Sequence, residues 1–233
     1  MSFYEQYLLK LSVVDWIGFA WFVFAWAGYE RLVERGWKGH KTLLAEGHAL
    51  RLGWARQMLY RENRIVDAAL VSNLINSVSF YANTSIYIIA GLFATLGALD
   101  QFLAAAADLP FARQTSREVL EIKLLMLVGV FVVAYFKFTW ALREFNVLSI
   151  IMGAVPPQES DPDELERFAQ RTAAVNACAG DDFNRGIRAY YFGMAILGWM
   201  VSPWIFIIAT TVIFAVQMHR EFNSPVLRAL QSL

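Results

Sequence analysis

The sequence predicts an all-α integral membrane protein with four transmembrane helices and helical cytoplasmic connections. Hydrophobic residues make up 58% of the 233-residue chain, and the mean hydropathy is +0.42, far from a typical soluble domain. Four apolar stretches reach the roughly 20 residues that a helix needs to cross a bilayer. Lys and Arg gather in two of the connections, as they do in cytoplasmic loops. Residues 1–233 are therefore expected to form a single membrane domain.

The four expected spans lie at about residues 11–31, 70–98, 122–152 and 189–218. The first contains aromatic residues throughout and lacks a signal-peptide cleavage pattern, so we expect it to be retained. The third and fourth are long enough to project beyond the bilayer or to cross it tilted. In the fourth, Pro203 removes a backbone donor and obstructs the carbonyl of Trp199, which predicts a kink. Ser202 is placed to help satisfy that carbonyl.

The distribution of Lys and Arg predicts the orientation of these spans. Counted with the adjoining span edges, the connections after the first and third spans hold fourteen basic residues. The N-terminus, the connection after the second span and the C-terminal tail together hold six. We therefore expect a multi-pass inner-membrane protein with its N- and C-termini outside, in the periplasm, and its two long connections in the cytoplasm.

Both cytoplasmic connections are expected to contain a helix. Residues 41–65 place Trp54, Met58 and several leucines at roughly helical spacing against a basic side. That pattern fits either a helix on the membrane surface or one packed against the cytoplasmic span ends. Residues 161–180 begin with Pro162 and acidic residues, which suit the first turn of a helix, and Gly180 offers a stop.

The second span is unusual because it carries amide and hydroxyl side chains among its apolar residues. Asn73, Asn76 and Asn83 fall close to one helical face, and Thr84 lies beside them. Amides in hydrocarbon need hydrogen-bond partners. Two interpretations follow: these residues fix helix packing or an oligomer contact, or they line a pathway for an ion or small solute.

Lys137 lies near the cytoplasmic end of the third span, in the stretch VFVVAYFKFTWALREF. Its long side chain allows the ammonium group to reach the lipid headgroups, which is the usual arrangement for a lysine near a helix end. The alternative is a buried ion pair with an acidic residue such as Asp67 or Glu144.

Four further residues are candidates for contact with a lipid headgroup or an anion. Arg143 and Asn146 share one helix face, where the guanidinium suits a phosphate or carboxylate. Arg185 and Arg188 precede the fourth span and are expected to anchor it at the interface. The tetrapeptide REFN at 143–146 recurs at 220–223, and four spans would place the two copies on opposite sides of the membrane. We expect the first copy to be the one with any functional role.

Composition and motifs also argue against other classes of protein. Twenty basic and twenty acidic residues balance, so no nucleic-acid partner is expected. A single cysteine, Cys178, and three scattered histidines predict neither a disulfide nor a metal site. The sequence lacks protease, hydrolase, Walker and dinucleotide-binding motifs. No catalytic residue and no cofactor is therefore expected.

Three long stretches carry a resemblance to a known family. RENRIVDAALVSNLINSVSFYANTSIYIIAGLFATLGALD, FKFTWALREFNVLSIIMGAVP and FNRGIRAYYFGMAILGWMVSPWIF resemble the uncharacterised membrane family catalogued as domain of unknown function 599. The resemblance covers nearly the whole chain and implies a fold without implying an activity. The residues in these family-like stretches are Asn73, Asn83, Lys137, Arg143, Asn146, Ser149, Gly153, Asn184, Arg185 and Pro203.

From these features we expect a non-enzymatic protein that acts as a homo-oligomer or as an accessory subunit of a larger membrane complex. Its partners would be the lipid bilayer and either further copies or other membrane subunits. The alternative is a small channel or transporter with an Asn-lined pathway along the second span, gated near Lys137 and Arg143. A lipid-modifying enzyme would need clustered carboxylate or His groups, which the sequence does not provide.

Overall fold

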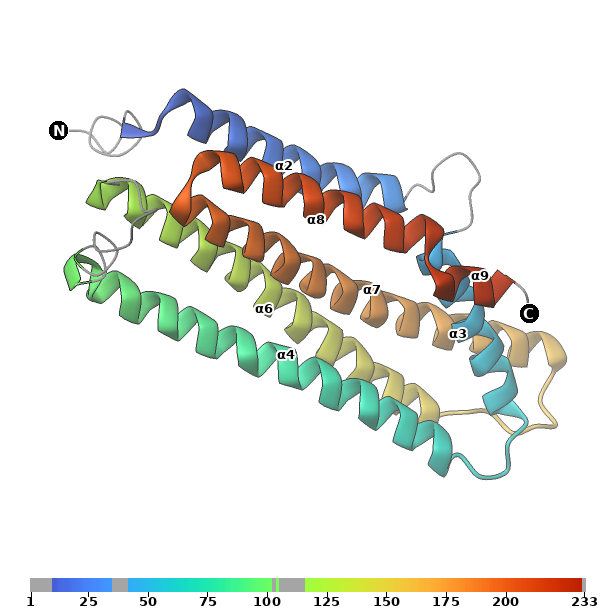
Figure 1. Ribbon diagram of the computed structural model, residues 1–233. Coiled ribbons are helices and arrows are strands. Elements are labelled where there is room, and N and C mark those ends of the chain that lie inside the picture. Colours follow the sequence, from blue (N-terminus) through green and yellow to red (C-terminus); the bar gives the residue numbers. More distant parts are fainter. Residues whose placement is uncertain (1–9, 35–41, 102–103, 105–115, 232–233) are drawn as a thin grey trace.

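The computed structural model describes residues 10–34, 42–101, 104 and 116–231. Its long helices lie side by side in a bundle, and two shorter helices close one end (Figure 1). We call this the α3 end and the opposite one the α2-start end. The described helices are α2 (Val13–Glu34), α3 (Leu43–Leu59), α4 (Ile65–Gly97), α6 (Arg117–Gly153), α7 (Pro162–Val201), α8 (Pro203–Asn223) and α9 (Pro225–Gln231).

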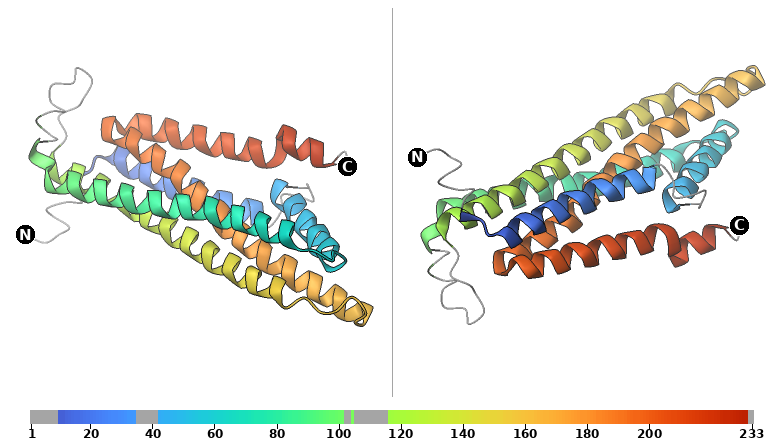
Figure 2. Two further views of the ribbon diagram at one scale, coloured as in Figure 1. Left: turned by 90° about the horizontal axis from the view of Figure 1, so that it is seen from below. Right: turned by 90° about the horizontal axis from the view of Figure 1, so that it is seen from above.

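The antiparallel pair of α6 and α7 forms the centre of the bundle. At 37 and 40 residues these helices are roughly 55 and 60 Å long, well beyond the thickness of a bilayer core. Helix α4 packs on α6, while α8 packs on α7 and α2 packs on α8 (Figures 1 and 2). Helix α3 lies across α7 at the end where α7 begins. Both helices are therefore long enough to project beyond a membrane, as expected for the third span.

Aromatic side chains fill the core between these helices. Phe138 of α6 stacks on Tyr81 of α4, and Tyr190 of α7 touches both rings. Close packing of Phe138 depends on Gly186, where an added Cβ would lie 2.5 Å from a ring carbon. A glycine at this one position thus lets the two longest helices approach each other.

The chain reverses direction at Ser202, where the sequence predicted only a kink. Helix α7 ends at Val201, Ser202 is extended (φ −160°, ψ 143°), and Pro203 begins α8. The two helices then run antiparallel (Figures 1 and 2). Phe22 of α2 contacts both Phe192 and Phe206, with centroids 5.7 and 5.4 Å away, which a continuous helix across 189–218 would not allow. The single fourth span was therefore wrong.

This hairpin changes the topology. Helix α2 begins at one end of the bundle and α9 lies at the other, beside α3 (Figure 1). If the long helices cross the membrane, the start of α2 and the end of α9 lie on opposite sides, which differs from the expectation that both termini are outside. Three helical segments are long and apolar enough to cross: Ile65–Gly97, Arg117–Gly153 and Pro203–Gln231. The protein is thus an all-helical bundle with the features of a multi-pass membrane protein.

Residues 41–65 contain a separate helix, as expected, whereas residues 161–180 do not. Residues 41–65 contain α3, which begins after Thr42, whose side chain accepts a hydrogen bond from the Ala45 backbone nitrogen. Residues 161–180 do not form a separate helix. They are the first half of α7, which continues through Gly180 because a lone glycine inside a well-packed helix weakens it without ending it.

Candidate functional site

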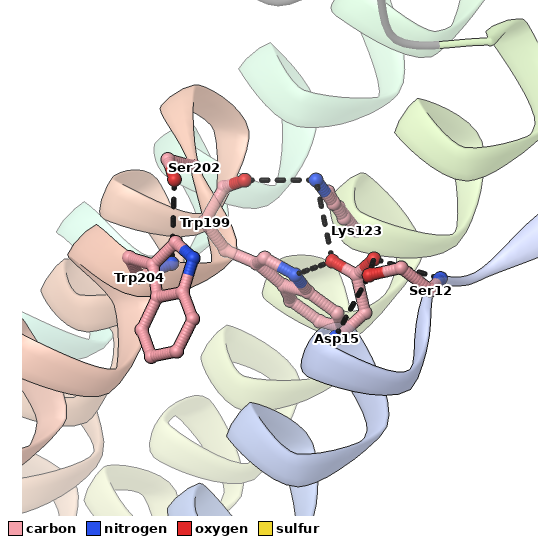
Figure 3. Close-up of polar contacts among 6 residues, drawn as sticks. All are labelled: Ser12, Asp15, Lys123, Trp199, Ser202 and Trp204. Carbon is pink, nitrogen blue, oxygen red and sulfur yellow. Dashed lines mark hydrogen bonds and ion pairs between the residues drawn. The ribbon is translucent and has the colours of Figure 1, made fainter.

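A buried polar cluster lies at the α2-start end of the bundle (Figure 3). Asp15 of α2 accepts hydrogen bonds from Trp199 Nε1 (2.6 Å) and from the backbone nitrogen and hydroxyl of Ser12 (2.9 and 2.6 Å). Lys123 Nζ of α6 lies 3.9 Å from Asp15 Oδ1 and donates a 2.9 Å hydrogen bond to the Trp199 carbonyl. Both charged residues are buried.

The cluster holds the hairpin between α7 and α8. In a continuous helix the backbone N–H of residue 203 would donate to the Trp199 carbonyl, but Pro203 has no N–H. Lys123 supplies that donor, whereas Ser202 instead caps α8 by accepting from Trp204 N (Figure 3). The proposed role of Ser202 was therefore wrong. Asp15 in SVVDWIGF and Lys123 in EIKLLMLV each lie in a mostly apolar run, and this pattern was the sequence signal for the pair.

A second charged layer lies farther along the bundle. Lys137 Nζ is 3.0 Å from Asp182 Oδ1, which Arg185 Nη1 also contacts at 3.0 Å, and the Lys137 ammonium lies 4.8 Å from the Trp140 ring centroid. Lys137 thus pairs with an acid on the neighbouring helix rather than with Asp67 or Glu144. Sequence spacing could not reveal this partner because the facing residue of α7 depends on how the two helices pack.

Asp67 belongs to a separate network where α3 meets α4. It is fully buried and accepts a 2.6 Å hydrogen bond from Trp54 Nε1 as well as a bond from Arg61. Nearby on the α3–α7 contact, His48 Nε2 lies 2.9 Å from Asp181 Oδ1, and Arg56 forms two hydrogen bonds with Glu166. These polar contacts attach α3 to the long helices.

The amide residues of α4 face away from the bundle. Asn73, Asn76 and Asn83 are exposed, whereas the half-exposed Thr84 donates to the Phe80 carbonyl of its own helix. The residues that α4 buries lie on the other side: Asp67, Val71, Val78, Ala82 and Ser85. The structure therefore brings Asn76 and Asn83 onto one outward surface, which we call the Asn face, whereas Asn73 lies at its edge and also borders a cavity between α4 and α7.

The candidate anion contacts are separated. Arg143 and Asn146 are exposed on α6, and Arg185 joins the Lys137 layer. Arg188 is buried with its guanidinium carbon 5.4 Å from the Tyr29 ring centroid. It lines a cavity of about 360 Å³ enclosed by α2, α3, α7, α8 and α9.

This cavity, called here the arginine cavity, also contains residues that the sequence analysis did not select. Arg51 enters it from α3, and Arg220 and Glu221 enter it from α8. The second REFN copy therefore lies at the same end of the bundle as the first, because α8 returns to that end. It contributes side chains to a cavity, whereas the Arg143 side chain of the first copy is exposed. The expectation that the two copies lie on opposite sides was therefore wrong, whereas the expectation that the first copy has any functional role stays a prediction.

Arg51 reaches the cavity across the surface of α7. A Cβ on Gly180 would overlap the Arg51 guanidinium, so the glycine makes room for the guanidinium where it lies. Burial lowers the pKa of Arg51, while the charge of Asp181 raises it. Arg51 and Asn184 also border a second cavity of about 510 Å³, lined by Trp54, Asn73, Val78 and Phe145 among others.

These features define a helical bundle with three helical segments able to cross a membrane, charged layers at two levels, an outward Asn face and a basic cavity. Among the described residues no group of three or more His, Cys, Asp or Glu could hold a metal ion. The chain belongs to the family described as "Protein of unknown function, DUF599", whose model matches residues 17–226. No curated protein and no solved structure matches it.

Proposed function

We propose that this protein is a non-enzymatic inner-membrane protein that acts as a homo-oligomer through the Asn face of α4. The observation that carries the proposal is the position of Asn76 and Asn83. They lie on the exposed side of a helix that is itself a candidate membrane span.

The geometry of α4 supports a contact between copies. At 100° per residue, Asn76 and Asn83 fall within about 20° of each other, roughly 150° from the buried residue Val78 and roughly 110° from the buried residue Ala82. In the most apolar 18-residue segment of α4 only 22% is buried, because this helix packs mainly on α6. Small residues continue the outward face at Ala90, Gly91 and Ala94, which permits close approach of a second helix.

The chemistry of the amides favours a partner over lipid. An unsatisfied amide in hydrocarbon costs several kcal/mol, whereas an interhelical hydrogen bond contributes about 0.6–2 kcal/mol. Asn carries both a donor and an acceptor, so the same residue on a second copy can satisfy it across a two-fold axis. Self-association therefore removes the cost without requiring another protein.

The basic residues support an orientation with the α3 end in the cytoplasm. The hairpin moves Arg220 and Arg228 to that end, which changes the basic count from fourteen against six to sixteen against four. Lys123 and Lys137 are fourteen residues apart on α6, so the layer between the two charged levels is roughly 21 Å thick. The N-terminus would then be periplasmic and the C-terminus cytoplasmic.

Two alternatives predict different partners for the same face. An accessory subunit would use the Asn face to bind another membrane protein. A channel or transporter with a pathway along Asn76 and Asn83 would need that pathway between copies, because these two residues are exposed on the outside of the protomer. Solute flux in liposomes that falls in the Asn76→Leu variant would favour that alternative.

The proposal is tested by particle mass in a mild detergent. We expect the wild-type protein to have the mass of an oligomer and the Asn76→Leu/Asn83→Leu variant to be a monomer. Asn146→Leu removes an exposed amide from α6 and should leave the mass unchanged, which makes it the matched control. A wild-type monomer with no co-purifying protein would contradict the proposal, and a stoichiometric second protein would favour the accessory-subunit alternative.

A further inference from the structure

The charge of the arginine cavity is strongly one-sided. Its lining includes Arg51, Arg188 and Arg220 but a single carboxylate, Glu221. One oxygen of that carboxylate accepts a 2.9 Å hydrogen bond from the Leu44 backbone nitrogen, which ties Glu221 to the start of α3. The cavity therefore carries an excess of positive charge at the level where α2 ends, and an anion is the ligand that balances it.

Two side chains that line this cavity each carry a buried donor without an acceptor among the described residues. The Nε atom of Arg188 is buried without a hydrogen-bond partner among the described residues, and so is the Nε2 atom of Gln217. Arg188 as a whole is only 8% exposed, so bulk solvent does not replace the missing partner. Leaving a buried donor unsatisfied is unfavourable, and more so when the donor is charged, so a ligand rich in acceptor oxygens would be stabilised here. Phosphate and sulfate oxygens match the planar guanidinium fork.

An apolar groove continues from the cavity along α8. It is lined by Tyr191, Val212, Ile213 and Val216 and shares Tyr191, Gln217 and Arg220 with the cavity. Val212 and Val216 are 54% and 52% exposed on a segment apolar enough to cross the membrane. A molecule with its anion among the arginines can therefore lay a hydrocarbon chain on α8.

We propose that the arginine cavity binds a phosphate-bearing amphiphile, with the phosphate between Arg51, Arg188 and Arg220 and an acyl chain in the groove between α7 and α8. The phosphate accounts for the charge and the unpaired donors, and the acyl chain accounts for the groove. An anionic phospholipid at the membrane surface combines both. This site is separate from the Asn face, so the proposal stands or falls independently of self-association.

Binding is measured on the purified full-length protein in a neutral detergent, with three probes. Dioctanoyl phosphatidic acid carries both parts of the ligand, inorganic phosphate carries only the anion, and dioctanoylglycerol carries only the chains. We expect saturable binding of dioctanoyl phosphatidic acid, at least tenfold weaker binding of inorganic phosphate, and none of dioctanoylglycerol. Equal affinity for phosphatidic acid and inorganic phosphate would overturn the groove part, and equal affinity for dioctanoylglycerol would overturn the arginine part.

Three variants test the assignment of residues. Arg188→Gln should weaken phosphatidic acid binding at least tenfold, and Gly180→Ala should weaken it because the added methyl group displaces the Arg51 guanidinium. Arg220→Gln changes an exposed residue at the junction with the groove and keeps the test valid if the buried variants fail to fold. Arg167→Gln, at an exposed arginine outside the cavity, is the control and should bind like wild type. Unchanged binding in folded Arg188→Gln and Arg220→Gln, or equal weakening in Arg167→Gln, would overturn the proposal.

Discussion

Replacing Lys123 with Met should destabilise the hairpin between α7 and α8. The substitution keeps the length of the side chain but removes its charge and its three donors. Asp15 then remains buried without a cation, although it keeps its bonds to Ser12 and Trp199. The Trp199 carbonyl loses the Lys123 donor at a position where Pro203 cannot replace it.

The distances set the expected size of this effect. A pair of unit charges 3.9 Å apart interacts by about 4 kcal/mol at an effective dielectric constant of about 20. The unpaired carbonyl adds about 1–3 kcal/mol, partly offset because Lys123 no longer needs to be desolvated. Removing one partner of a buried pair commonly costs about 3–5 kcal/mol, so we expect a loss of about 4 kcal/mol. For a chain of this size that corresponds to about 8–16 °C in melting temperature.

Equilibrium unfolding in mixed detergent micelles measures the free energy directly. Lys10→Met removes a lysine at the same end that pairs with Glu118, with side chains 39% and 26% exposed, and should cost less than about 1 kcal/mol. The double variant Lys123→Met/Asp15→Asn removes both charges and should recover about 2 kcal/mol relative to Lys123→Met. A loss below about 1 kcal/mol for Lys123→Met, or no recovery in the double variant, would refute the role of this cluster.

The remaining predictions concern packing, topology and pH. Gly186→Ala should lower the free energy of unfolding by about 1–3 kcal/mol because its Cβ meets the Phe138 ring. The control Gly129→Ala has open space at its Cβ and should be neutral or slightly stabilising. Equal melting temperatures of the two variants would contradict this prediction. Reporter fusions at the N- and C-termini should report opposite sides of the membrane, and the same side would contradict the hairpin. Hydrogen bonds from Arg56 hold the pKa of Glu166 below its usual 4.5. The contribution of this pair to folding stability is therefore present above pH 4.5 and lost as pH falls through the lower folded-state pKa. The melting temperatures of wild type and Glu166→Gln should therefore converge in acid. A constant difference would contradict the pairing.

Much of the helical content could be predicted from the sequence, but the path of the chain could not. Apolar runs long enough to cross a bilayer identify α4 and α6, with their ends predicted within one residue and their starts five residues late. The run 189–218 is equally apolar, and a proline inside such a run is compatible with either a kink or a reversal. The outcome depends on Lys123 and Asp15, which are far apart in sequence. Only after the helices pack does Lys123 donate to the Trp199 carbonyl and Asp15 accept from Trp199 Nε1.

The candidate residues show the same division. Helical periodicity correctly placed Asn76 and Asn83 on one face, because that depends on local geometry alone. It could not decide whether this face points inward, since the direction depends on which side of α4 packs on α6. The arginine cavity was missed because its three arginines come from α3, α7 and α8. Nothing in the sequence spacing of Arg51, Arg188 and Arg220 indicates that they lie together.

Cysteine cross-linking in native membranes tests self-association through α4 most directly. The native thiol is first removed by Cys178→Ser, because Cys178 is exposed. With Asn83→Cys, mild oxidation should give a disulfide-linked dimer, since residues facing each other across a two-fold contact can bring their Cβ atoms within the roughly 3.5–4.5 Å that a disulfide requires. The neighbouring Ala82→Cys faces α6 and should remain monomeric. No dimer from Asn83→Cys, or equal amounts from both variants, would contradict the Asn face as the contact between copies.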